Sequence, residues 1–516
     1  MNDIPEVKKR PNILLITSDQ HRGDCYGFEG RKVRTPNLDK LAAGGTRFSA
    51  CITPNVVCQP SRASMLTGLL PSTHGVSDNG IDLSEEAAGK GFASQLSGAG
   101  YQTGFVGKAH FSTYVTFRPT GRPECIQSSG DFPDDWFGPY MGFDRVEMML
   151  IGHNFFLPEA PPLGLHYEKW FYKDGKGPER IAQYLTRLPP EVTAPQTFNS
   201  GLPVEVHNST WVGDQTIDFL RAHSEDDEPF CLWTSFPDPH HPFDAPAPWN
   251  QLHHPDEVDL PQHRTRDLEQ RPWWHKASVE STPDLPENLR RIREEYSRIG
   301  EVSDQQLREL IGNYYGMISL IDHNVGRIMD ALRETGLDKD TIVVFTSDHG
   351  DWLGDHGLIL KGPMMYDGLM RVGLIASGPG IPAGKVVSSP VSTIDLHETF
   401  LDYAGTTGSV PSHGQSLRPL IEGEESRDFA LNEWDLRAGR CGVALDLRTV
   451  RTSRYRMTVE RNSSAGELYD LQEDPNEMVN LFDDPSRKAV RKELEDMLAT
   501  RPLDAIEPPL PQTGTA

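Results

Sequence analysis

Short apolar runs alternate along the chain with stretches of helical periodicity. Four runs have the length and composition of buried strands: 12–18 (NILLITS), 103–107 (TGFVG), 229–236 (PFCLWTSF) and 340–348 (DTIVVFTSD). Near-continuous apolar runs, rather than strict alternation of apolar and polar residues, are typical of strands that are covered on both faces. The pattern therefore predicts an α/β fold whose mostly parallel sheet is flanked by helices.

The clearest helix precedes the last of these runs. Ser303 and Gln306 have the spacing of a capping box, and Gly336 supplies a stop signal. We expect a long core helix between them, which leads into the strand at 340–348 through a short turn. Its apolar stripe consists of Leu307, Leu310, Ile311, Tyr314, Met317, Ile318, Ile321, Val325, Ile328 and Leu332.

Charged and histidine side chains, which can act in catalysis or bind a metal ion, lie just beyond each of the four predicted strands. They are Asp19 after the first strand, Lys108 and His110 after the second, His240 and His241 after the third, and Asp348 and His349 after the fourth. In an open parallel sheet, ligands bind beyond the carboxyl ends of the strands. We therefore expect these side chains to converge on one crevice.

Two long stretches, 112–200 and 245–300, are rich in proline, tryptophan and charge and interrupt the alternation. We interpret them as surface insertions that wall a pocket or contact another subunit. Nearer the C-terminus the pattern becomes that of a small antiparallel sheet, with a polar helix near 485–499 and a Pro-rich tail. The predicted organisation is a larger domain over 1–410 and a smaller C-terminal domain with its tail over 411–516.

Composition narrows the class of protein. With 516 residues, 37% hydrophobic and 24% charged, the chain can bury a sizeable core. A net charge of −25 argues against nucleic acid or an anionic membrane as partner, although local cations still permit a small anionic substrate. The N-terminal apolar run is too short for a signal peptide or a membrane span, and the six scattered cysteines indicate reduced thiols in a cytoplasmic protein.

Cys58 opens a small-residue helical stretch in VVCQPSRASMLTG, residues 56–68. Pro60 suits the first turn of a helix, and Ser61 and Arg62 would place a hydroxyl and a cation beside the sulfur at the positive helix end. Such surroundings lower a thiol pKa and favour an anion. From these residues alone, a buried structural cysteine and a plain cysteine nucleophile both remain open, although no local Cys-His-Asn signature accompanies the thiol.

The stretch CQPSRASMLTG resembles the C-x-P-S-R-x-x-x-L-T-G signature of the type I sulfatases, close to the arylsulfatase and phosphonate monoester hydrolase branch of the alkaline phosphatase superfamily. The similarity continues in order through PNILLITSDQHRGDCYG, GYQTGFVGKAHF, FPDPHHPFDAP, TIVVFTSDHGDWLGDHGL and KGPMMYDGLMRVGLI. It implies an alkaline-phosphatase-like fold and a sulfuric ester hydrolase with its catalytic domain over 1–410. In that family a formylglycine-generating enzyme oxidises the cysteine, so the resemblance implies that the Cys58 thiol is a precursor and that this enzyme is a partner during maturation.

The chemistry implied by the resemblance uses a hydrated aldehyde. One hydroxyl of the geminal diol, held by a divalent cation, attacks the sulfur of a small anionic sulfate ester and expels the alcohol; the second hydroxyl then drives release of sulfate. Calcium is the expected ion for this oxygen-rich site, and manganese is the alternative because His349 stands where some members have asparagine. The implied cation ligands are Asp19, Asp348, His349, Cys58 as formylglycine and, as a further candidate, Gln20.

The remaining roles also come from the resemblance. It assigns sulfate binding to two lysines, contact with the diol and proton removal to one histidine, and protonation of the leaving alcohol to another. An arginine would stabilise the diol oxygen, and an asparagine would line the pocket. In this sequence these residues are Lys108 and Lys361, His110, His240, Arg62 and Asn79, with His241 an unassigned neighbour of His240.

The sequence motifs leave other functions open. Phosphonate monoester hydrolases and phosphodiesterases of the superfamily use the same aldehyde and similar metal ligands, but Lys108, His110, Pro60 and Ser61 together favour sulfate esters. A phosphatase or mutase of the same fold would use Ser61 or Thr67 as nucleophile and would need a second metal ion. A binding protein that retains the crevice without catalysis is a third hypothesis.

The leaving alcohol is not specified by these motifs. The tryptophans of the two insertions are compatible with an aryl or other apolar group, although packing is the more common use of such residues. The RPWWHK segment and the tail beyond residue 500 suggest subunit contacts, and we expect a homo-oligomer. The tryptophans in question are Trp136, Trp170, Trp273 and Trp274.

Overall fold

The computed structural model of the chain describes residues 10–150, 163–280, 287, 290, 299–423 and 426–515. Parts of both predicted insertions, namely 151–162 and most of 281–298, lie outside the described residues.

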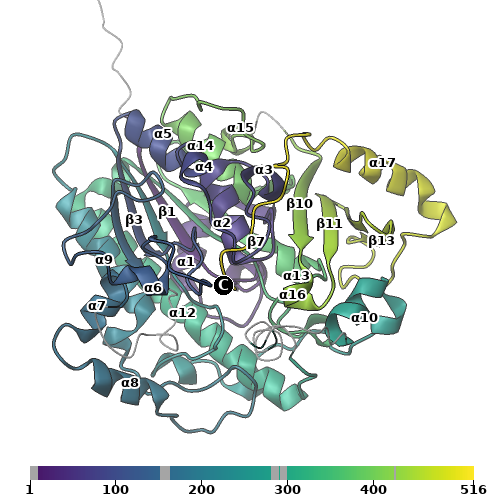
Figure 1. Cartoon of the computed structure of the whole chain (residues 1–516), viewed down its shortest axis with the longest axis horizontal. Helices are drawn as coiled ribbons and strands as arrows, with labels where there is room; N and C mark the ends of the chain where they lie inside the picture. Colours follow the sequence, from purple (N-terminus) through teal and green to yellow (C-terminus); the bar gives the residue numbers. More distant parts are fainter. Residues whose placement is uncertain are drawn as a thin grey trace, which may run out of the picture.

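A mixed sheet forms the centre of the described chain (Figure 1). Its strands follow the order β4-β3-β5-β1-β6-β7-β2-β8, and β9 pairs with β2. The predicted strands at 12–18, 103–107, 229–236 and 340–348 are confirmed as β1, β3, β5 and β6. The bounds are β1 (Asn12–Ser18), β2 (Thr46–Ile52), β3 (Gln102–Lys108), β4 (Arg145–Met149), β5 (Phe230–Ser235), β6 (Thr341–Ser347), β7 (Arg371–Ser377), β8 (Lys385–Val387) and β9 (Val391–Ser392).

The sheet is mostly parallel, as predicted. Strand β1 pairs in parallel with β5 and β6, and β3 pairs in parallel with β4 and β5. Strand β7 runs antiparallel to both β6 and β2. The sequence pattern did not reveal β2, β4 or β7. Because β4 lies within the stretch 112–200, that stretch also builds one edge of the sheet in addition to surface structure.

Helices cover both faces of the sheet (Figure 1). Successive residues of β1 enter different cores: Ile13 and Leu15 face one cluster, and Leu14 and Ile16 face the other. Six of the helices are α1 (Pro36–Ala43), α2 (Cys58–Thr67), α5 (Phe92–Gly98), α9 (Asn208–Ala222), α12 (Asp304–Thr335) and α14 (Leu396–Tyr403). The others are α3 (Pro71–His74), α4 (Glu85–Ala88), α6 (Ile126–Ser129), α7 (His166–Tyr172), α8 (Gly177–Leu185), α10 (Trp273–Glu280), α13 (Asp367–Met370), α15 (Arg418–Glu422), α16 (Ala438–Cys441) and α17 (Lys488–Leu498).

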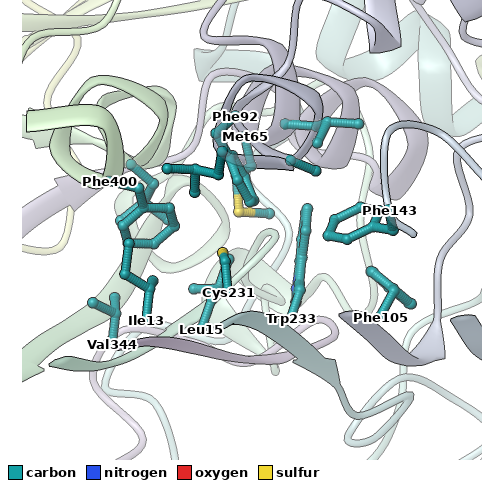
Figure 2. Packing of buried hydrophobic residues seen from close by; sticks show 14 of the residues in the cluster. Ile13, Leu15, Met65, Phe92, Phe105, Phe143, Cys231, Trp233, Val344 and Phe400 are labelled. Carbon is teal, nitrogen blue, oxygen red and sulfur yellow. The ribbon is translucent and has the colours of Figure 1, made fainter. Parts of the chain in front are cut away.

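Helix α2 is anchored on the core by Met65. Figure 2 shows this side chain beside Phe92, with Phe400 and Trp233 in the same cluster. Met65 is fully buried, and burying a side chain of this size stabilises the fold by about 1.5–3 kcal/mol. Since α2 begins at Cys58, the same contact holds the thiol in a defined place.

The long helix α12 confirms the prediction from its caps. The Ser303 side chain accepts a hydrogen bond from the Gln306 N–H, and the Gln306 side chain accepts one from the Ser303 N–H. Gly336 ends the helix in a left-handed conformation with φ of 74°, which glycine adopts without steric cost. A short 3₁₀ turn then leads into β6.

A second, antiparallel sheet lies in the C-terminal region, as predicted. Its four strands follow the order β10-β11-β12-β13. Their bounds are β10 (Phe429–Leu436), β11 (Leu445–Thr452), β12 (Tyr455–Glu460) and β13 (Ala465–Asp470), and the predicted polar helix is α17. Strand β10 joins the two parts of the fold through the hydrogen bond of Glu433 N–H to Pro54 O. The boundary between domains near residue 410 stays a prediction.

Two observations bear on the environment of the chain. None of the helices in the described ranges combines the length and apolar character needed to cross a bilayer. All six cysteines lie in those ranges, are buried and form no disulfide bond. The cytoplasmic location inferred from the cysteine pattern stays a prediction.

Candidate active site

The predicted site residues leave the sheet at one edge. Strands β1 and β6 pair in register, with Ser18 opposite Ser347, so Asp19 and Asp348 emerge side by side. Strands β3 and β5 also pair in parallel, up to Gly107 and Ser235, and Lys108 and the loop after β5 emerge at the same edge. The convergence expected beyond the carboxyl ends of the strands is therefore present for Asp19, Lys108, Asp348 and His349.

Four buried side chains form the centre of the site. One potential ligand atom from each of Asp19, Cys58, Asp348 and His349 lies within 4.8 Å of the others. Cys58 Sγ is 3.3 Å from His349 Nε2 and 3.7 Å from Asp19 Oδ1. His349 Nδ1 is 2.9 Å from Gly350 O, so Nδ1 carries a hydrogen and Nε2 is the ring nitrogen that faces the cluster. This donor set suits a divalent cation.

Gln20 adds a fifth potential ligand. Its side-chain Nε2 donates to Asp351 Oδ2 at 2.6 Å, and its backbone N–H donates to Asp348 Oδ1 at 3.1 Å. Its Oε1 is buried and has no hydrogen-bond partner in the described part of the chain. Since Asp351 holds the amide nitrogen, the oxygen is the atom left to meet a cation, which fits the predicted metal site.

Replacing Asp351 with asparagine is expected to weaken cation binding about 10- to 100-fold. Oδ1 of Asp351 accepts from the N–H groups of Leu353 and Leu360, at 2.6 and 3.1 Å. Asparagine would keep those bonds with its oxygen, and its amide nitrogen would then oppose that of Gln20, turning the Gln20 oxygen away. Calcium and manganese titrations of chelator-treated protein by calorimetry measure the effect.

Asp355→Asn is the matched control, because this carboxylate lies in the same loop and bonds Arg22. Equal cation affinity of both variants and the native chain would contradict the role of Asp351.

Arg62 holds both carboxylates. Its Nε donates to Asp348 Oδ2 at 2.9 Å, and a terminal nitrogen lies 3.3 Å from Asp19 Oδ2. The other terminal nitrogen donates to Lys108 O and Ser235 Oγ at 2.7 and 2.8 Å. Lys108 Nζ lies 2.5 Å from Asp19 Oδ2. Burial raises the pKa of Asp19, but Lys108 and Arg62 outweigh burial and keep that pKa well below its usual range.

Lys361 also contacts the sulfur. Its Nζ is 3.3 Å from Cys58 Sγ and 3.1 Å from His349 Nε2. Burial and the Asp19 carboxylate raise the pKa of the Cys58 thiol, yet Lys361, Lys108 and His349 reverse this, and the pKa lies below its ordinary value. The surroundings of residue 58 therefore favour an anionic group.

His110 has two buried ring nitrogens without a hydrogen-bond partner among the described residues. Burial lowers the pKa of His110 well below its usual value, and the nearby Lys108 and Arg62 lower it further, so the imidazole is neutral at neutral pH. Its φ of 52° is left-handed, as is the φ of Gln20 (64°) and of Leu360 (67°). Such strained backbone in non-glycine residues is typical of functional sites.

His240 and His241 lie on the loop after β5, which is tied to the cluster through the hydrogen bond of Asp19 N–H to Asp238 O at 2.9 Å. The two imidazoles stack with ring centroids 4.1 Å apart. His240 Nδ1 lies 2.6 Å from His241 O and therefore carries a hydrogen. The role of His240 as the acid that protonates the leaving alcohol stays a prediction.

Asn79 acts on the backbone beside the thiol. Its Oδ1 accepts the hydrogen bond of Gln59 N–H at 3.0 Å, and Gln59 directly follows Cys58. The Gln59 side chain returns to the same loop by accepting from Gly80 N–H at 2.6 Å. Asn79 thus holds the first turn of α2 in place, while the substrate-binding role carried over from the resemblance stays a prediction.

Two hydroxyls considered as alternative nucleophiles are engaged elsewhere. Ser61 Oγ donates to Asp348 O at 2.6 Å, and Thr67 Oγ1 donates to Ala63 O at 2.7 Å. That the Ser61 hydroxyl also lies beside the sulfur of Cys58 stays a prediction. Arg62, the other half of that expectation, does lie within the cluster.

Sequence patterns missed two residues of the site. Asp351 orients Gln20, and Ser235 accepts from Arg62 at the end of β5. The only signal for Asp351 is its position in SDHGD, an acid two residues beyond His349. Ser235 carries no signal, because its partner comes from a helix far away in the sequence.

The tryptophans of the predicted insertions differ in role. Trp274 is fully buried in a cluster with Met364 and Trp434, and its Nε1 donates to Pro363 O. Trp273 next to it is 45% exposed. Trp274 therefore serves packing and is not available to a leaving group.

Comparisons with known proteins point to one family. The Sulfatase family model matches residues 11–406, and the model of the N-sulphoglucosamine sulphohydrolase C-terminal region matches 354–502. The arylsulfatase of Clostridium perfringens (strain 13 / Type A) is 31% identical over 504 residues, which cover 94% of this chain and 95% of that protein. The choline-sulfatase of Rhizobium meliloti (strain 1021) is 27% identical over 484 residues, covering 92% and 83%.

A solved structure shows the same architecture. The crystal structure of the phosphonate monoester hydrolase of Agrobacterium radiobacter superposes with a TM-score of 0.75 and 27% identity, covering 95% of each chain. The match to the Sulfatase model covers more than half of the chain and includes the site from Asp19 to Lys361. The family resemblance drawn from the motifs is thus confirmed, and the chain belongs to the sulfatase family of sulfuric ester hydrolases in the alkaline phosphatase superfamily.

Proposed function

We propose that this chain is an arylsulfatase-like enzyme that hydrolyses sulfate esters with a formylglycine made from Cys58 and one divalent cation. The observation that carries the proposal is the position of Cys58. Its sulfur lies at the start of α2, 3.3 Å from Lys361 Nζ and 3.3 Å from His349 Nε2, within a buried set of cation ligands. As an aldehyde hydrate, residue 58 would supply a nucleophilic oxygen and a route to release sulfate.

The cation would be held by oxygen and imidazole donors. Asp19, Asp348, His349 and the modified residue 58 would be ligands, with Gln20 the fifth. Mostly hard oxygen donors suit Ca²⁺, and the imidazole makes Mn²⁺ the alternative. When bound, the ion supplies a positive charge that stabilises negatively charged oxygen.

The remaining residues bind the sulfate group or transfer protons. Lys108 and Lys361 present ammonium groups that bind the sulfate oxygens and offset their charge. The neutral imidazole of His110 accepts a proton, and its unpartnered nitrogens support that role. His240 donates a proton to the leaving alcohol. Arg62 fixes the two carboxylates so that they need not reorganise during the reaction.

Maturation adds a constraint. Cys58 is only 1% exposed, so a formylglycine-generating enzyme would have to reach the thiol before α2 packs on the sheet.

A cytoplasmic location and a homo-oligomeric state are further parts of the proposal. Fractionation of producing cells and light scattering of the purified chain test them.

His240→Asn is expected to lower kcat/KM about 10²- to 10⁴-fold for alkyl sulfates and far less for nitrophenyl sulfate. Only an alkoxide needs protonation as it leaves, whereas nitrophenolate is stable without it. The measurement is kcat/KM across a series of leaving groups of rising pKa. His241→Asn is the control, and equal losses on both substrate types in His240→Asn would contradict the acid role.

The second candidate is a phosphonate monoester hydrolase or phosphodiesterase with the same nucleophile, which the likeness to the Agrobacterium radiobacter enzyme favours. A panel of aryl sulfates, choline sulfate, sugar sulfates and phosphonate monoesters, assayed with Ca²⁺ and with Mn²⁺, separates the two. We expect an aryl sulfate to have the highest kcat/KM and phosphonates to be slower, promiscuous substrates. The highest kcat/KM on a phosphonate monoester would replace the proposed function by the second candidate.

A further inference from the structure

The C-terminal tail, residues 500–515, returns from α17 to the larger part of the fold. The yellow trace in Figure 1 passes α3 and ends near the middle of the molecule. Ile506 N–H donates to Ser72 O at 2.8 Å, and Arg437 donates to Leu510 O at 2.6 Å. A Cβ added at Gly75 would lie 2.5 Å from Leu510 Cδ1, so the Leu510 side chain packs directly on this backbone.

The last described residues pair with two loops. Thr513 N–H donates to Gly80 O at 2.8 Å, Phe117 N–H donates to Thr513 O at 3.0 Å, and Thr515 N–H donates to Val115 O at 2.9 Å. A Cβ at Gly514 would lie 2.1 Å from Val115 O, so only glycine allows this close approach. The end of the tail thus forms a short strand-like connection between the loop at residue 80 and the loop at residues 115–117.

The Thr513 side chain reinforces the connection. Its Oγ1 lies 2.9 Å from Asp82 Oδ1 and 3.0 Å from Thr113 Oγ1. Asp82 Oδ1 also accepts from Thr113 N–H at 2.8 Å. One hydroxyl therefore joins both loops through side chains, in addition to the backbone bonds.

Each of these loops carries a residue of the candidate site. Gly80 directly follows Asn79. Asn79 Oδ1 accepts from Gln59 N–H, and Gly80 N–H donates to Gln59 Oε1, next to Cys58 in the chain. Thr113 lies three residues after His110, whose strained φ of 52° needs support from its surroundings. The tail itself carries no residue of the cluster that would hold the cation, so any effect on the reaction passes through these loops.

We propose that residues 512–515 act as a positioning strap that holds the loops of Asn79 and His110 in their working geometry, with Thr513 as a positioning residue. The inference rests on the proposed function. Displacement of catalytic groups by about 1 Å can cost about 100-fold in rate, so greater mobility of these two loops should lower kcat. Sulfate binding is assigned to Lys108 and Lys361, which lie outside the strap's bonds to residues 80–82 and 113–117, so KM should change less than kcat.

The test is a chain that ends at Pro511, which keeps the Leu510 contact and loses the strap. We expect a thermal unfolding temperature near that of the full chain, a kcat on an aryl sulfate lowered about tenfold or more, and a smaller change in KM. Hydrogen exchange should become faster at residues 78–83 and 112–117 and stay unchanged in α12. A native kcat in the shortened chain overturns the proposal, whatever the exchange shows.

Two point variants decide the matter if the shortened chain does not fold. Thr513→Val removes the hydroxyl and should lower kcat severalfold, whereas Thr513→Ser keeps it and should restore the native rate. Leu503→Ala is the control within the tail, because Leu503 is fully exposed. Equal kcat and exchange for both Thr513 variants and the native chain overturn the role of Thr513. A full-length chain without sulfatase activity would instead reject the proposed function, and the exchange measurement would still report on the strap.

Discussion

Replacing Cys58 with alanine is expected to abolish turnover of sulfate esters, with a loss of at least about 1,000-fold in kcat, because the proposed nucleophile derives from this side chain. Stability should fall only slightly, since alanine suits the first turn of α2 and Met65 still anchors the helix. Initial rates on nitrophenyl sulfate and the thermal unfolding temperature measure the two effects. Cys58→Ser should give at most one turnover per site, because serine can accept the sulfuryl group but lacks the second hydroxyl.

Cys231→Ala is the matched control, because Cys231 is equally buried in the core, on β5. It should lose some stability and keep the native rate. Peptide mass spectrometry of the active chain should show an aldehyde at position 58. A native rate in Cys58→Ala would contradict the nucleophile assignment, and an unmodified thiol in fully active protein would contradict the formylglycine.

Asp19→Asn is expected to abolish both activity and the stabilisation by added cation. The negative charge of the Asp19 carboxylate offsets the positive charges of Lys108, 2.5 Å away, and Arg62, 3.3 Å away. All three side chains are buried. Removing one member of such a group leaves uncompensated charge, which costs about 3–5 kcal/mol of the free energy of unfolding. Urea denaturation of chelator-treated protein measures this loss, and a calcium-dependent shift of the unfolding temperature measures cation binding.

The effect of Asp19→Asn should depend on pH with a definite sign. Burial opposes ionisation of Asp19, but Lys108 and Arg62 keep its folded-state pKa well below the ordinary value. A depressed carboxyl pKa contributes stability above the unfolded-state pKa of about 3.9, and this contribution is lost as the pH falls through the folded-state pKa. The stability difference between the native chain and the variant should therefore be largest near neutral pH and shrink in acid.

Asp134→Asn controls for loss of a surface carboxylate, since Asp134 is 97% exposed although it lies 3.1 Å from Lys169. It should change neither stability nor cation binding measurably. A native calcium response in Asp19→Asn would contradict the ligand assignment. A stability difference that grows as the pH falls would contradict the charge balance around Asp19.

Much of the fold follows from local patterns. Strands β1, β3, β5 and β6 and helix α12 were predicted within a few residues, because apolar periodicity and the caps at Ser303 and Gly336 act over short stretches of chain. Convergence of Asp19 and Asp348 was also predictable, since parallel strands end at one edge of a sheet.

Other parts depended on packing between distant segments. The antiparallel strand β7 and the edge strand β4 give weak local signals, and their places are decided by the partners that cover them. Ser61 is one such case: the motif predicts a hydroxyl in the first turns of α2, but not that this hydroxyl bonds Asp348 O. A side chain turns toward its best acceptor, and that acceptor lies 287 residues away.

The sequence by itself determined the sheet type, the long helix, the family and the residues at the strand ends, because each of these depends on short-range patterns or on motif order. Only the tertiary structure decided that Asp351 orients Gln20 and that the tail reaches Gly80, 433 residues from Thr513. The physical reason is that hydrogen bonds and close packing select partners by their positions in space, and separation along the chain carries no information about those positions.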